Sequence, residues 1–434
     1  MHDFRYRGNK LFCEGVAVES LARRFGTPLY VYSQRTLTGH FQRLDAAFSP
    51  VAHLVCFALK ANGNLSVLRA LANRGSGFDI VSGGELQRVI AAGGDPRRCV
   101  FAGVAKTGAE IEFALRQNIY AFNVESEPEL QRINRLAARL GKIAPFAVRV
   151  NPDVPAGTHA KITTGTYANK FGIALEQVAA VYARARRLKN LRPRGVQMHI
   201  GSQLTSVAPF EQAVRKVLPL VRRLQAEYAL EFFSIGGGLG IVYQPALASG
   251  PAAWWRSPAA KNILTPEKYA ARLLPLLKPL GLKILIEPGR FIVGNAGILV
   301  TSALYHKNSG QKRFLIVDAG MNDLIRPSLY DAYHDIRPVM EPASNKKTVV
   351  DVVGPICESG DFLARDRELP EVQQGDLLAV MGAGAYGFSM SSNYNSRSRA
   401  AEVMVKGNEY YIVRERETYN DLIKGEKVPR WLMG

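Results

Sequence analysis

The sequence has few cysteines and no long apolar run. Among its 434 residues only four are cysteine, and they stand far apart, at Cys13, Cys56, Cys99 and Cys357. Such spacing excludes a zinc-ribbon site and argues against a disulfide framework, so we expect no metal. The best candidate for a membrane span, residues 284–305, is interrupted by Glu287 and Arg290. We therefore expect no membrane-spanning segment and no membrane partner.

Acidic residues are also scarce compared with basic ones. There are 37 acidic and 56 basic residues, which gives a formal net charge of +19. An excess of this size raises the question of a nucleic-acid or anionic partner. The densest basic group lies in and after an alanine-rich helical pattern, without interleaved aromatic residues: Arg184, Arg186, Arg187, Lys189, Arg192 and Arg194. This pattern favours a solvated helix face, and we expect no nucleic-acid partner.

The length and the first residues bear on organisation and location. A chain of 434 residues exceeds the size at which one hydrophobic core usually stops growing, so two domains are expected. Residues 1–5 lack the apolar core of a signal peptide, and with so few cysteines this predicts a cytoplasmic protein.

An alternation of apolar runs and helical spacing dominates the middle of the chain. The runs occupy residues 53–59, 78–82, 99–104, 121–125, 146–151, 196–200, 232–236 and 283–287. Eight strands separated by helices predict an α/β fold, a (β/α)₈ TIM-like barrel over residues 36–290. A doubly wound open sheet is the alternative architecture.

Outside this region the pattern changes to short strands and turns. Strand-like runs at 313–317, 347–351, 376–381 and 410–413 predict a C-terminal antiparallel β-domain over residues 291–434, completed by the N-terminal segment 1–35. Residues 244–266 are expected to form a loop inserted between the last two barrel strands.

Several polar residues stand directly after the predicted barrel strands, where barrel enzymes place their chemistry. Lys60 follows the first strand, His199 the sixth, the glycines 236–238 the seventh and Glu287 the eighth. A lone strand-end lysine is more often a solvated charge, and a glycine-rich turn is common. Together, however, a Schiff-base lysine, a flat imidazole, a glycine phosphate cradle with Ser202 and a carboxylate are what pyridoxal 5'-phosphate requires.

These residues lie in segments that resemble a known family. FALKAN (57–62), FDIVSGGE (78–85), NKFGI (169–173), HIGSQ (199–203), IGGGLG (235–240) and EPGR (287–290) are similar to the fold-type III pyridoxal-phosphate decarboxylases with an alanine racemase-like barrel. DAGMNDLIRPSLYDAYH (318–334) and GPICESGDFLA (354–364) more narrowly resemble the diaminopimelate decarboxylases. The resemblance covers essentially the whole chain and implies decarboxylation of meso-2,6-diaminopimelate to L-lysine and CO₂.

The resemblance also implies site residues. Lys60 matches the lysine that binds the cofactor covalently, His199 the imidazole stacked on its ring, and Glu287 the partner of its pyridine nitrogen. Asp79 and Glu85 match acids near the cofactor. The groups around the phosphate correspond to Ser202, Gly237, Gly238, the backbone of Gly289 and Arg290, and Tyr386.

The implied substrate contacts come mostly from the second domain. Arg290, Arg326 and Tyr330, joined by Tyr386, match the clamp on the distal carboxylate, for which the planar guanidinium is suited. Arg326 and Tyr330 are four apart, so a helical turn would place both on one face. Glu358 matches the acceptor of the distal ammonium and Cys357 the thiol that protonates the product carbon. In the family these last two reach the site from a partner subunit, which implies a homodimer with shared active sites.

Three alternatives remain open on the sequence. A related decarboxylase acting on carboxynorspermidine, lysine or ornithine shares the barrel motifs. A catalytically silent regulator on the same barrel would be expected to have lost Lys60 or Cys357. A racemase needs a second base on the opposite face.

Phe57 stands where a tyrosine is frequent in the family and Asn169 where a serine is frequent, and neither change removes a catalytic group.

Overall fold

The computed structural model describes residues 1–155, 170–344 and 346–433, and the chain divides into two compact units. The barrel unit comprises Gln34–Val242 and Ala252–Asn295, and the sheet unit comprises Met1–Ser33, Tyr243–Pro251 and Ala296–Gly434. The short segment Tyr243–Pro251 thus belongs with the sheet unit, although the sequence pattern assigns it to a loop of the barrel. Asn169 of the NKFGI motif lies outside the described residues.

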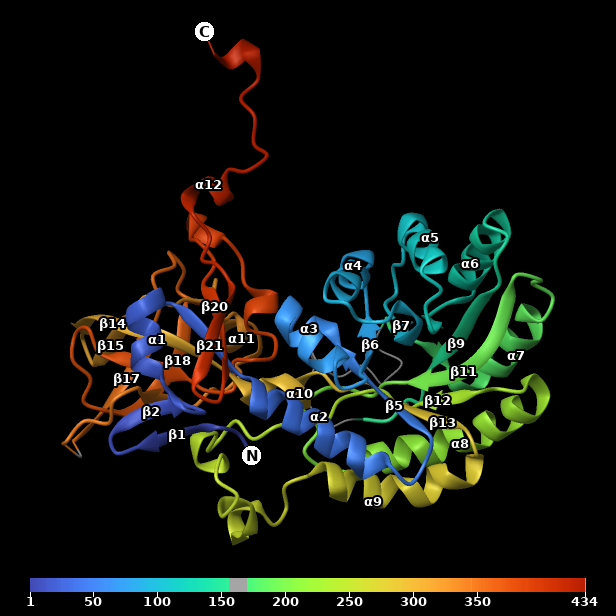
Figure 1. Cartoon of the computed structure of the whole chain (residues 1–434), viewed down its shortest axis with the longest axis horizontal. Coiled ribbons are helices and arrows are strands. Elements are labelled where there is room, and N and C mark those ends of the chain that lie inside the picture. The colour runs from blue at the N-terminus through green and yellow to red at the C-terminus, as the bar shows by residue number, and fades with distance from the viewer. Residues whose placement is uncertain (156–169, 345, 434) are drawn as a thin grey trace. The chain divides into compact units, whose positions relative to one another are not determined.

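The barrel unit is built on a closed parallel sheet (Figure 1). Its eight strands, in order around the barrel, are β5 (His53–Ala58), β6 (Gly77–Ile80), β7 (Cys99–Phe101), β8 (Ala121–Val124), β9 (Ala144–Asn151), β11 (Leu191–Met198), β12 (Phe232–Ser234) and β13 (Lys283–Ile286). Closure occurs where β13 pairs with β5, and a short strand, β10 (Ile173–Ala174), adds to β9. The predicted barrel is confirmed, and the open-sheet alternative is wrong.

Helices alternate with these strands and cover the outside of the barrel (Figure 1). They are α2 (Gln34–Phe48), α3 (Leu65–Ala72), α4 (Gly83–Ala91), α5 (Gly108–Arg116), α6 (Glu127–Arg139), α7 (Leu175–Ala185), α8 (Ala208–Tyr228) and α9 (Pro266–Leu277). The N-caps of α3 to α6 are Asn64, Ser82, Thr107 and Ser126, whose side chains accept backbone N–H groups. Such caps accept hydrogen bonds from backbone N–H groups in the first turn that have no partner within the helix. At α3 to α6, the turn that follows a strand therefore also starts a helix.

The inside of the barrel explains why its strands read as continuous apolar runs. Parallel strands covered by helices are buried on both faces. A buried cluster contains Leu54 and Cys56 from β5, Val100 from β7, Phe232 from β12 and Leu285 from β13. Because the interior is filled by side chains, chemistry is confined to the ends of the strands.

The sheet unit contains two sheets. The small one joins β1 (Phe4–Arg7), β2 (Lys10–Cys13) and β3 (Val16–Ala17), which is followed by α1 (Val18–Phe25). The main path of the large one runs in the order β18 (Phe362–Pro370), β17 (Lys347–Val353), β15 (Lys312–Val317), β14 (Gly297–Ser309), β4 (Leu29–Ser33), β20 (Ala401–Lys406) and β21 (Glu409–Arg414). Two further strands lie off this path: β19 (Leu377–Val380) pairs with β14, and β16 (Ile336–Pro338) pairs with β19.

The N-terminal segment completes this large sheet through β4, as predicted. The sheet is nevertheless mixed, because β15 pairs with β17 and β20 pairs with β4 in parallel. The purely antiparallel arrangement expected from the sequence is therefore wrong for these two pairs. Alternating residues cannot reveal strand direction, since they look the same in both orientations.

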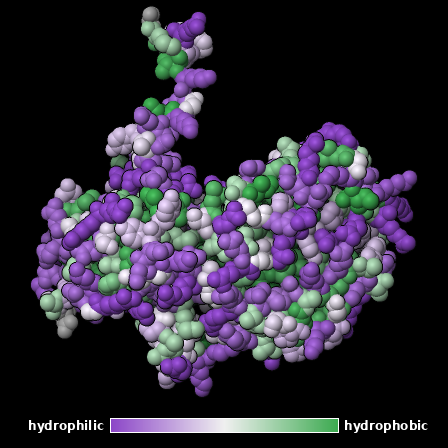
Figure 2. Space-filling view, viewed as in Figure 1, coloured by the Kyte–Doolittle hydropathy of each residue, from purple (hydrophilic) through white to green (hydrophobic). Residues whose placement is uncertain are grey.

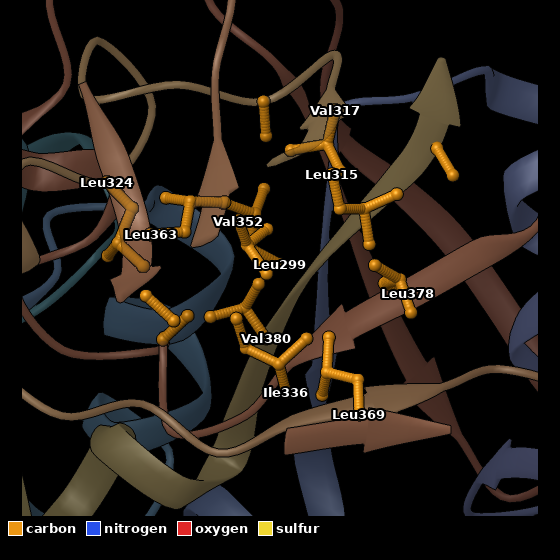
Figure 3. Close-up of a cluster of buried hydrophobic side chains, with 14 of the residues drawn as sticks. Leu299, Leu315, Val317, Leu324, Ile336, Val352, Leu363, Leu369, Leu378 and Val380 are labelled. Carbon is orange, nitrogen blue, oxygen red and sulfur yellow. The ribbon is translucent and has the colours of Figure 1, made fainter. Parts of the chain in front are cut away.

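The core of the large sheet is apolar (Figure 3). Leu299 and Val317 come from β14 and β15, Val352 and Leu363 from β17 and β18, and Val380 from β19. All five are at most 1% exposed. This packing fixes the loops that leave the strands of the sheet.

The surface is mainly hydrophilic on the face shown in Figure 2. Part of the basic group is neutralised, since Arg184 pairs with Glu127 at 2.6 Å while Arg192 and Arg194 both pair with Glu231 at 2.7 Å. Among the described residues no helix has both the length and the apolar composition needed to cross a bilayer.

Candidate active site

Lys60 lies at the carboxyl end of β5, in a single turn of 3₁₀ helix, Leu59–Ala61. Its Nζ donates to Oδ2 of Asp79 at 2.8 Å. Asp79 comes from the neighbouring strand β6, where it is the register partner of Ala58, and is 2% exposed, whereas the lysine side chain is 40% exposed. The amine is therefore held by a buried carboxylate and remains open to a ligand. A merely solvated lysine would lack the buried partner.

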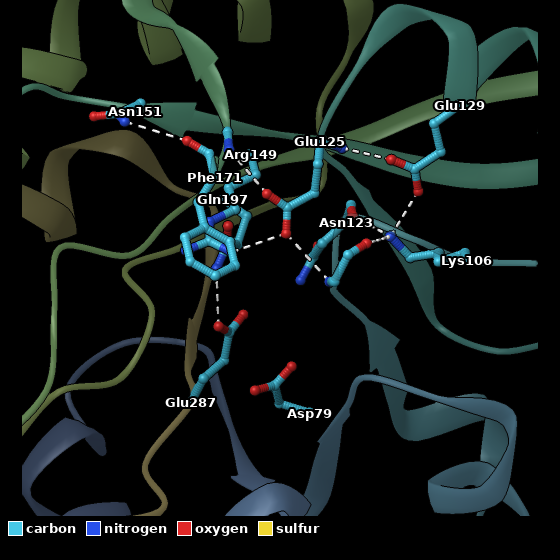
Figure 4. Close-up of polar contacts among 12 residues, drawn as sticks. Asp79, Lys106, Asn123, Glu125, Glu129, Arg149, Asn151, Phe171, Gln197 and Glu287 are labelled. Carbon is cyan, nitrogen blue, oxygen red and sulfur yellow. Dashed lines mark hydrogen bonds and ion pairs between the residues drawn. The ribbon is translucent and has the colours of Figure 1, made fainter. Parts of the chain in front are cut away.

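Glu287 follows β13 and is 5% exposed. Ser234 Oγ donates to its Oε1 at 2.6 Å, and Gln197 Nε2 donates to its Oε2 at 2.9 Å. Burial, followed by the nearby Asp79 carboxylate, raises the pKa of Glu287 to about 7. Figure 4 shows Glu287 beside Asp79 and joined to Gln197. A carboxylate held in this way can share a proton with a basic ring nitrogen.

His199 follows β11, and its ring is held in one tautomer. The backbone N–H of Gly237 donates to His199 Nδ1 at 3.2 Å, so the proton of a neutral ring sits on Nε2. Burial lowers the pKa of His199 well below its ordinary value, and the Arg149 and Lys60 charges lower it further. The imidazole is therefore neutral and suited to stacking on an aromatic ring.

The glycines after β12 form a close-packed turn. A Cβ atom on Gly237 would stand 2.0 Å from the carbonyl oxygen of Glu287, and one on Gly238 would stand 2.5 Å from that of Gly201. Gly238 also has a φ of +111°, a conformation that favours glycine. Only glycine fits at these two positions, and the backbone N–H of Gly238 can approach an anion closely.

Ser202 and Arg290 meet at the end of the barrel formed by the carboxyl ends of its strands. Arg290 Nη2 donates to Ser202 Oγ at 3.1 Å. Arg290 is 6% exposed and begins the short helix α10 (Arg290–Val293), for which Gly289 is the N-cap residue. A Cβ atom on Gly289 would stand 3.0 Å from the Cβ of Ala61, so this glycine lets the turn pack against the Lys60 segment.

In the sheet unit, the predicted helical turn that carries Arg326 and Tyr330 is present as α11 (Arg326–Tyr330). Arg326 is 5% exposed, its Nη1 lies 2.8 Å from His334 Nε2, and its guanidinium stands over the Tyr243 ring at 4.9 Å. His334 Nδ1 lies 2.8 Å from the carbonyl oxygen of Met381. An arginine can only donate, so His334 accepts at Nε2 and donates from Nδ1.

Cys357 and Glu358 lie on the loop between β17 and β18, where both are exposed. The buried Asp361 carboxylate shapes this loop by accepting the N–H groups of Met321 and Ile356, each at 2.6 Å. Glu358 accepts a hydrogen bond from Tyr394 Oη. Tyr386, also in the sheet unit, has a φ of +57°, which marks a tight turn.

Comparisons with known proteins identify the family. A family model for the pyridoxal binding domain of pyridoxal-dependent decarboxylases matches residues 34–294. The diaminopimelate decarboxylase of Neisseria meningitidis serogroup A is 50% identical over 96% of this chain and 98% of its own, and that of Pseudomonas aeruginosa is 50% identical over 99% of both. The crystal structure of diaminopimelate decarboxylase from Helicobacter pylori complexed with L-lysine superposes with a TM-score of 0.87 at 41% identity, over 94% of this chain and 98% of that one.

The chain belongs to the diaminopimelate decarboxylase family of pyridoxal-dependent decarboxylases. The resemblance read from the motifs is thereby confirmed, and so is pyridoxal phosphate as the cofactor. The residues brought together in the barrel fit that group. Asp79 Oδ1 is buried and has no hydrogen-bond partner among the described residues, and Gly237 and Gly238 carry no side chain that would keep an anion away from their backbone. Lys60 would offer the cofactor an amine, Glu287 a carboxylate, and Ser202 with Arg290 a polar end.

The barrel of this decarboxylase family member also holds a charged network that the sequence did not single out (Figure 4). Glu125, at the end of β8, accepts from Arg149 Nη1 at 2.8 Å and from the N–H groups of Gly103 and Gly172 at 3.2 and 2.8 Å. Arg149 stands over the Phe171 ring at 4.7 Å. The network thus ties the described part of the NKFGI motif to two strand ends. The available signal was a lone arginine inside the apolar run 146–151.

A second buried pair supports the same region. Lys106 Nζ donates to Glu129 Oε1 at 2.6 Å, and also to the carbonyl oxygens of Gly103 and Asn123 at 2.7 and 2.9 Å. Its side chain is 1% exposed. All three protons of the ammonium are therefore used, which makes this lysine structural, in contrast to Lys60.

Proposed function

We propose that this chain decarboxylates meso-2,6-diaminopimelate to L-lysine and CO₂ with pyridoxal phosphate, the last step of lysine biosynthesis. The observation that carries the proposal is 50% identity over nearly the full length to diaminopimelate decarboxylases, in a chain whose Lys60 amine is paired with Asp79. The L-lysine named in the complex of the Helicobacter pylori relative is the product of this reaction.

The barrel unit is proposed to hold the cofactor. Lys60 would hold the cofactor through its Nζ, and the neutral His199 ring would pack against it. The phosphate would be held by Ser202, Gly237, Gly238, the backbone of Gly289 and Arg290, and Tyr386 of the sheet unit. When bound, pyridoxal phosphate supplies an electron sink for the pair of electrons that remains after a carboxylate departs.

Glu287 is proposed to hold a proton at the ring nitrogen of the cofactor. Its buried carboxyl group, with a pKa raised to about 7, is suited to this role. Asp79 holds the Lys60 amine through the 2.8 Å ion pair whenever that amine is not bonded to the cofactor. As the bond between Cα and the α-carboxylate breaks, CO₂ leaves. The Cys357 thiol then gives a proton to Cα.

Substrate choice is proposed to rest on the distal end of the substrate. Arg290, Arg326, Tyr330 and Tyr386 take the distal carboxylate, and Glu358 takes the distal ammonium. Arg326 is already oriented by His334 at 2.8 Å. A substrate without the distal carboxylate would leave charged donors without their partner, so we expect it to be rejected strongly.

We further propose a homodimer with shared active sites, in which Cys357 and Glu358 of one subunit serve the barrel of the other. The exposure of both residues supports this. Mixing Lys60→Ala and Cys357→Ala proteins tests it, because half of the random heterodimers' sites would be intact. Recovery of about a quarter of the wild-type activity is expected for a shared-site dimer, and no recovery would contradict it. The cytoplasmic location and the lack of a nucleic-acid partner stay predictions.

The direct test is L-lysine formation from meso-diaminopimelate by the holoenzyme. Lys60→Ala should abolish both activity and the fixation of pyridoxal to the protein by borohydride. Lys278→Ala, a change of an exposed barrel lysine, is the matched control and should act like wild type. An active Lys60→Ala protein would refute the mechanism.

The rival activities are decided by substrate comparison. CO₂ release measured with diaminopimelate, carboxynorspermidine, lysine and ornithine separates the proposed enzyme from a related decarboxylase. Arg326→Ala should raise KM for diaminopimelate steeply and weaken the preference for it. Release from lysine or ornithine at a higher kcat/KM than from diaminopimelate would favour the alternative.

A further inference from the structure

We infer that Gln197 and Ser234 are positioning residues that hold Glu287 as an aligned carboxylate toward the ring nitrogen of the cofactor. The inference deepens the proposed function and rests on the role proposed there for Glu287. Neither residue lies in the sequence motifs that carry the family resemblance. Both act through Glu287 and not on the substrate.

Strand register brings these side chains together. In the parallel pairing of β11 with β12, Gln197 is the partner of Ser234, and in that of β12 with β13, Ser234 is the partner of Leu285. Partners on neighbouring strands point to the same face, and so do residues two apart along one strand direction. Glu287, two residues after Leu285, therefore turns toward the other two.

The hydroxyl of Ser234 has a defined direction. Its Oγ accepts the backbone N–H of Gly236 at 3.3 Å, and lies 2.6 Å from Glu287 Oε1. Because the N–H can only donate, the single hydroxyl proton points at the carboxylate. Ser234 is 0% exposed, so no bulk water competes for this contact.

The amide of Gln197 completes the arrangement. Its Nε2 donates to Glu287 Oε2 at 2.9 Å, whereas its Oε1 is buried and has no hydrogen-bond partner among the described residues. A protonated Glu287 would instead require an acceptor at this position. Both carboxylate oxygens thus receive one donor each, which is the pattern expected for the ionised form.

These donors act against the surroundings of Glu287. Burial and the Asp79 carboxylate favour its neutral form, and the Ser234 and Gln197 hydrogen bonds and the Lys60 charge favour the ionised form. Cys56 of β5 also faces it, as a buried thiol whose pKa is raised by burial and then by Glu287 and Asp79. Without the two donors, the proton shared with the ring nitrogen would move toward Glu287.

The test uses holoenzyme loaded with ¹⁵N-labelled pyridoxal phosphate, whose ring-nitrogen NMR signal reports protonation without turnover. Gln197→Met and Ser234→Ala should each move the signal toward the unprotonated value. The expected shift of the proton equilibrium is roughly tenfold to a hundredfold for each lost hydrogen bond to a charge. In parallel, kcat should fall while KM changes little, because substrate contacts remain.

Two matched controls remove side chains of the same kind elsewhere in the barrel unit. Ser76→Ala deletes a buried hydroxyl that bonds to the Gly77 carbonyl oxygen at 2.6 Å. Gln225→Met deletes an amide that bonds to the Leu280 carbonyl oxygen at 2.8 Å. Both should keep the wild-type nitrogen signal.

Glu287→Ala separates the two possible failures. If it shifts the signal while Gln197→Met and Ser234→Ala do not, the positioning inference is overturned and the role of Glu287 stands. If Glu287→Ala leaves the signal unchanged, the proposed role of Glu287 is overturned and the inference with it. A shift in all three variants, with unchanged controls, supports the inference.

Discussion

Replacing Glu287 by glutamine in the cofactor-free protein measures what its buried charge costs the fold. Burial and the Asp79 carboxylate raise the pKa of Glu287 from 4.5 to about 7. An acid whose pKa is higher in the folded than in the unfolded state destabilises the fold as the pH rises between the two values. One pKa unit corresponds to about 1.4 kcal/mol, so the cost is about 1 kcal/mol at pH 5 and about 3 kcal/mol at pH 8.

Glutamine removes the charge and keeps the shape. Ser234 Oγ can still donate to the new amide oxygen, and the buried Oε1 of Gln197 can accept from the new NH₂ group once the Gln197 amide turns over. We therefore expect Glu287→Gln to stabilise the cofactor-free protein, chiefly at high pH. With an unfolding entropy of roughly 0.9 kcal/mol/K for a chain of this length, the gain in Tm is about 3 °C at pH 8 and about 1 °C at pH 5.

The assay is thermal unfolding of both cofactor-free proteins from pH 5 to pH 8, followed by circular dichroism. The difference between the two proteins cancels other buried acids, such as Glu85, whose pKa burial raises to about 7 in both. A difference in Tm that does not grow with pH, or a wild type that is the more stable protein at pH 8, would refute the reasoning.

Three further changes give separate tests. Gly237→Ala places a Cβ atom 2.0 Å from a backbone carbonyl oxygen, so we expect activity to fall about a hundredfold and cofactor binding, followed by absorbance titration, to weaken; wild-type binding would contradict a close-packed turn. Lys106→Met leaves the Glu129 carboxylate buried without its cation and should lower the free energy of unfolding by about 3–5 kcal/mol in denaturant titrations, whereas adding Glu129→Gln should restore most of it. His334→Leu removes the acceptor 2.8 Å from Arg326 and should raise KM for diaminopimelate roughly tenfold with a smaller change in kcat. A fall in kcat with no change in KM would argue that His334 does not orient Arg326 toward the substrate.

Local patterns along the chain were sufficient for the barrel and for its strand-end residues. Parallel strands buried on both faces are apolar throughout. The eight runs could therefore be recognised without deciding which face of each strand is buried. Polar residues that end such runs, Lys60 and Glu287 among them, could be recognised because they interrupt an otherwise apolar pattern. The helical turn from Arg326 to Tyr330 followed from their spacing of four.

Only the tertiary structure decided which distant residues share one environment. Gln197 and Ser234 look like ordinary polar residues near strand ends, and their convergence on Glu287 depends on the register of three strands and on closure of the barrel. The same holds for Arg149 with Glu125, and for the parallel pairs in the mixed sheet. Sequence patterns report how each segment is buried, whereas long-range pairing sets which buried groups meet. Strands that are buried on both faces have no alternation that would specify their register, and strand direction leaves no periodic trace in the chain.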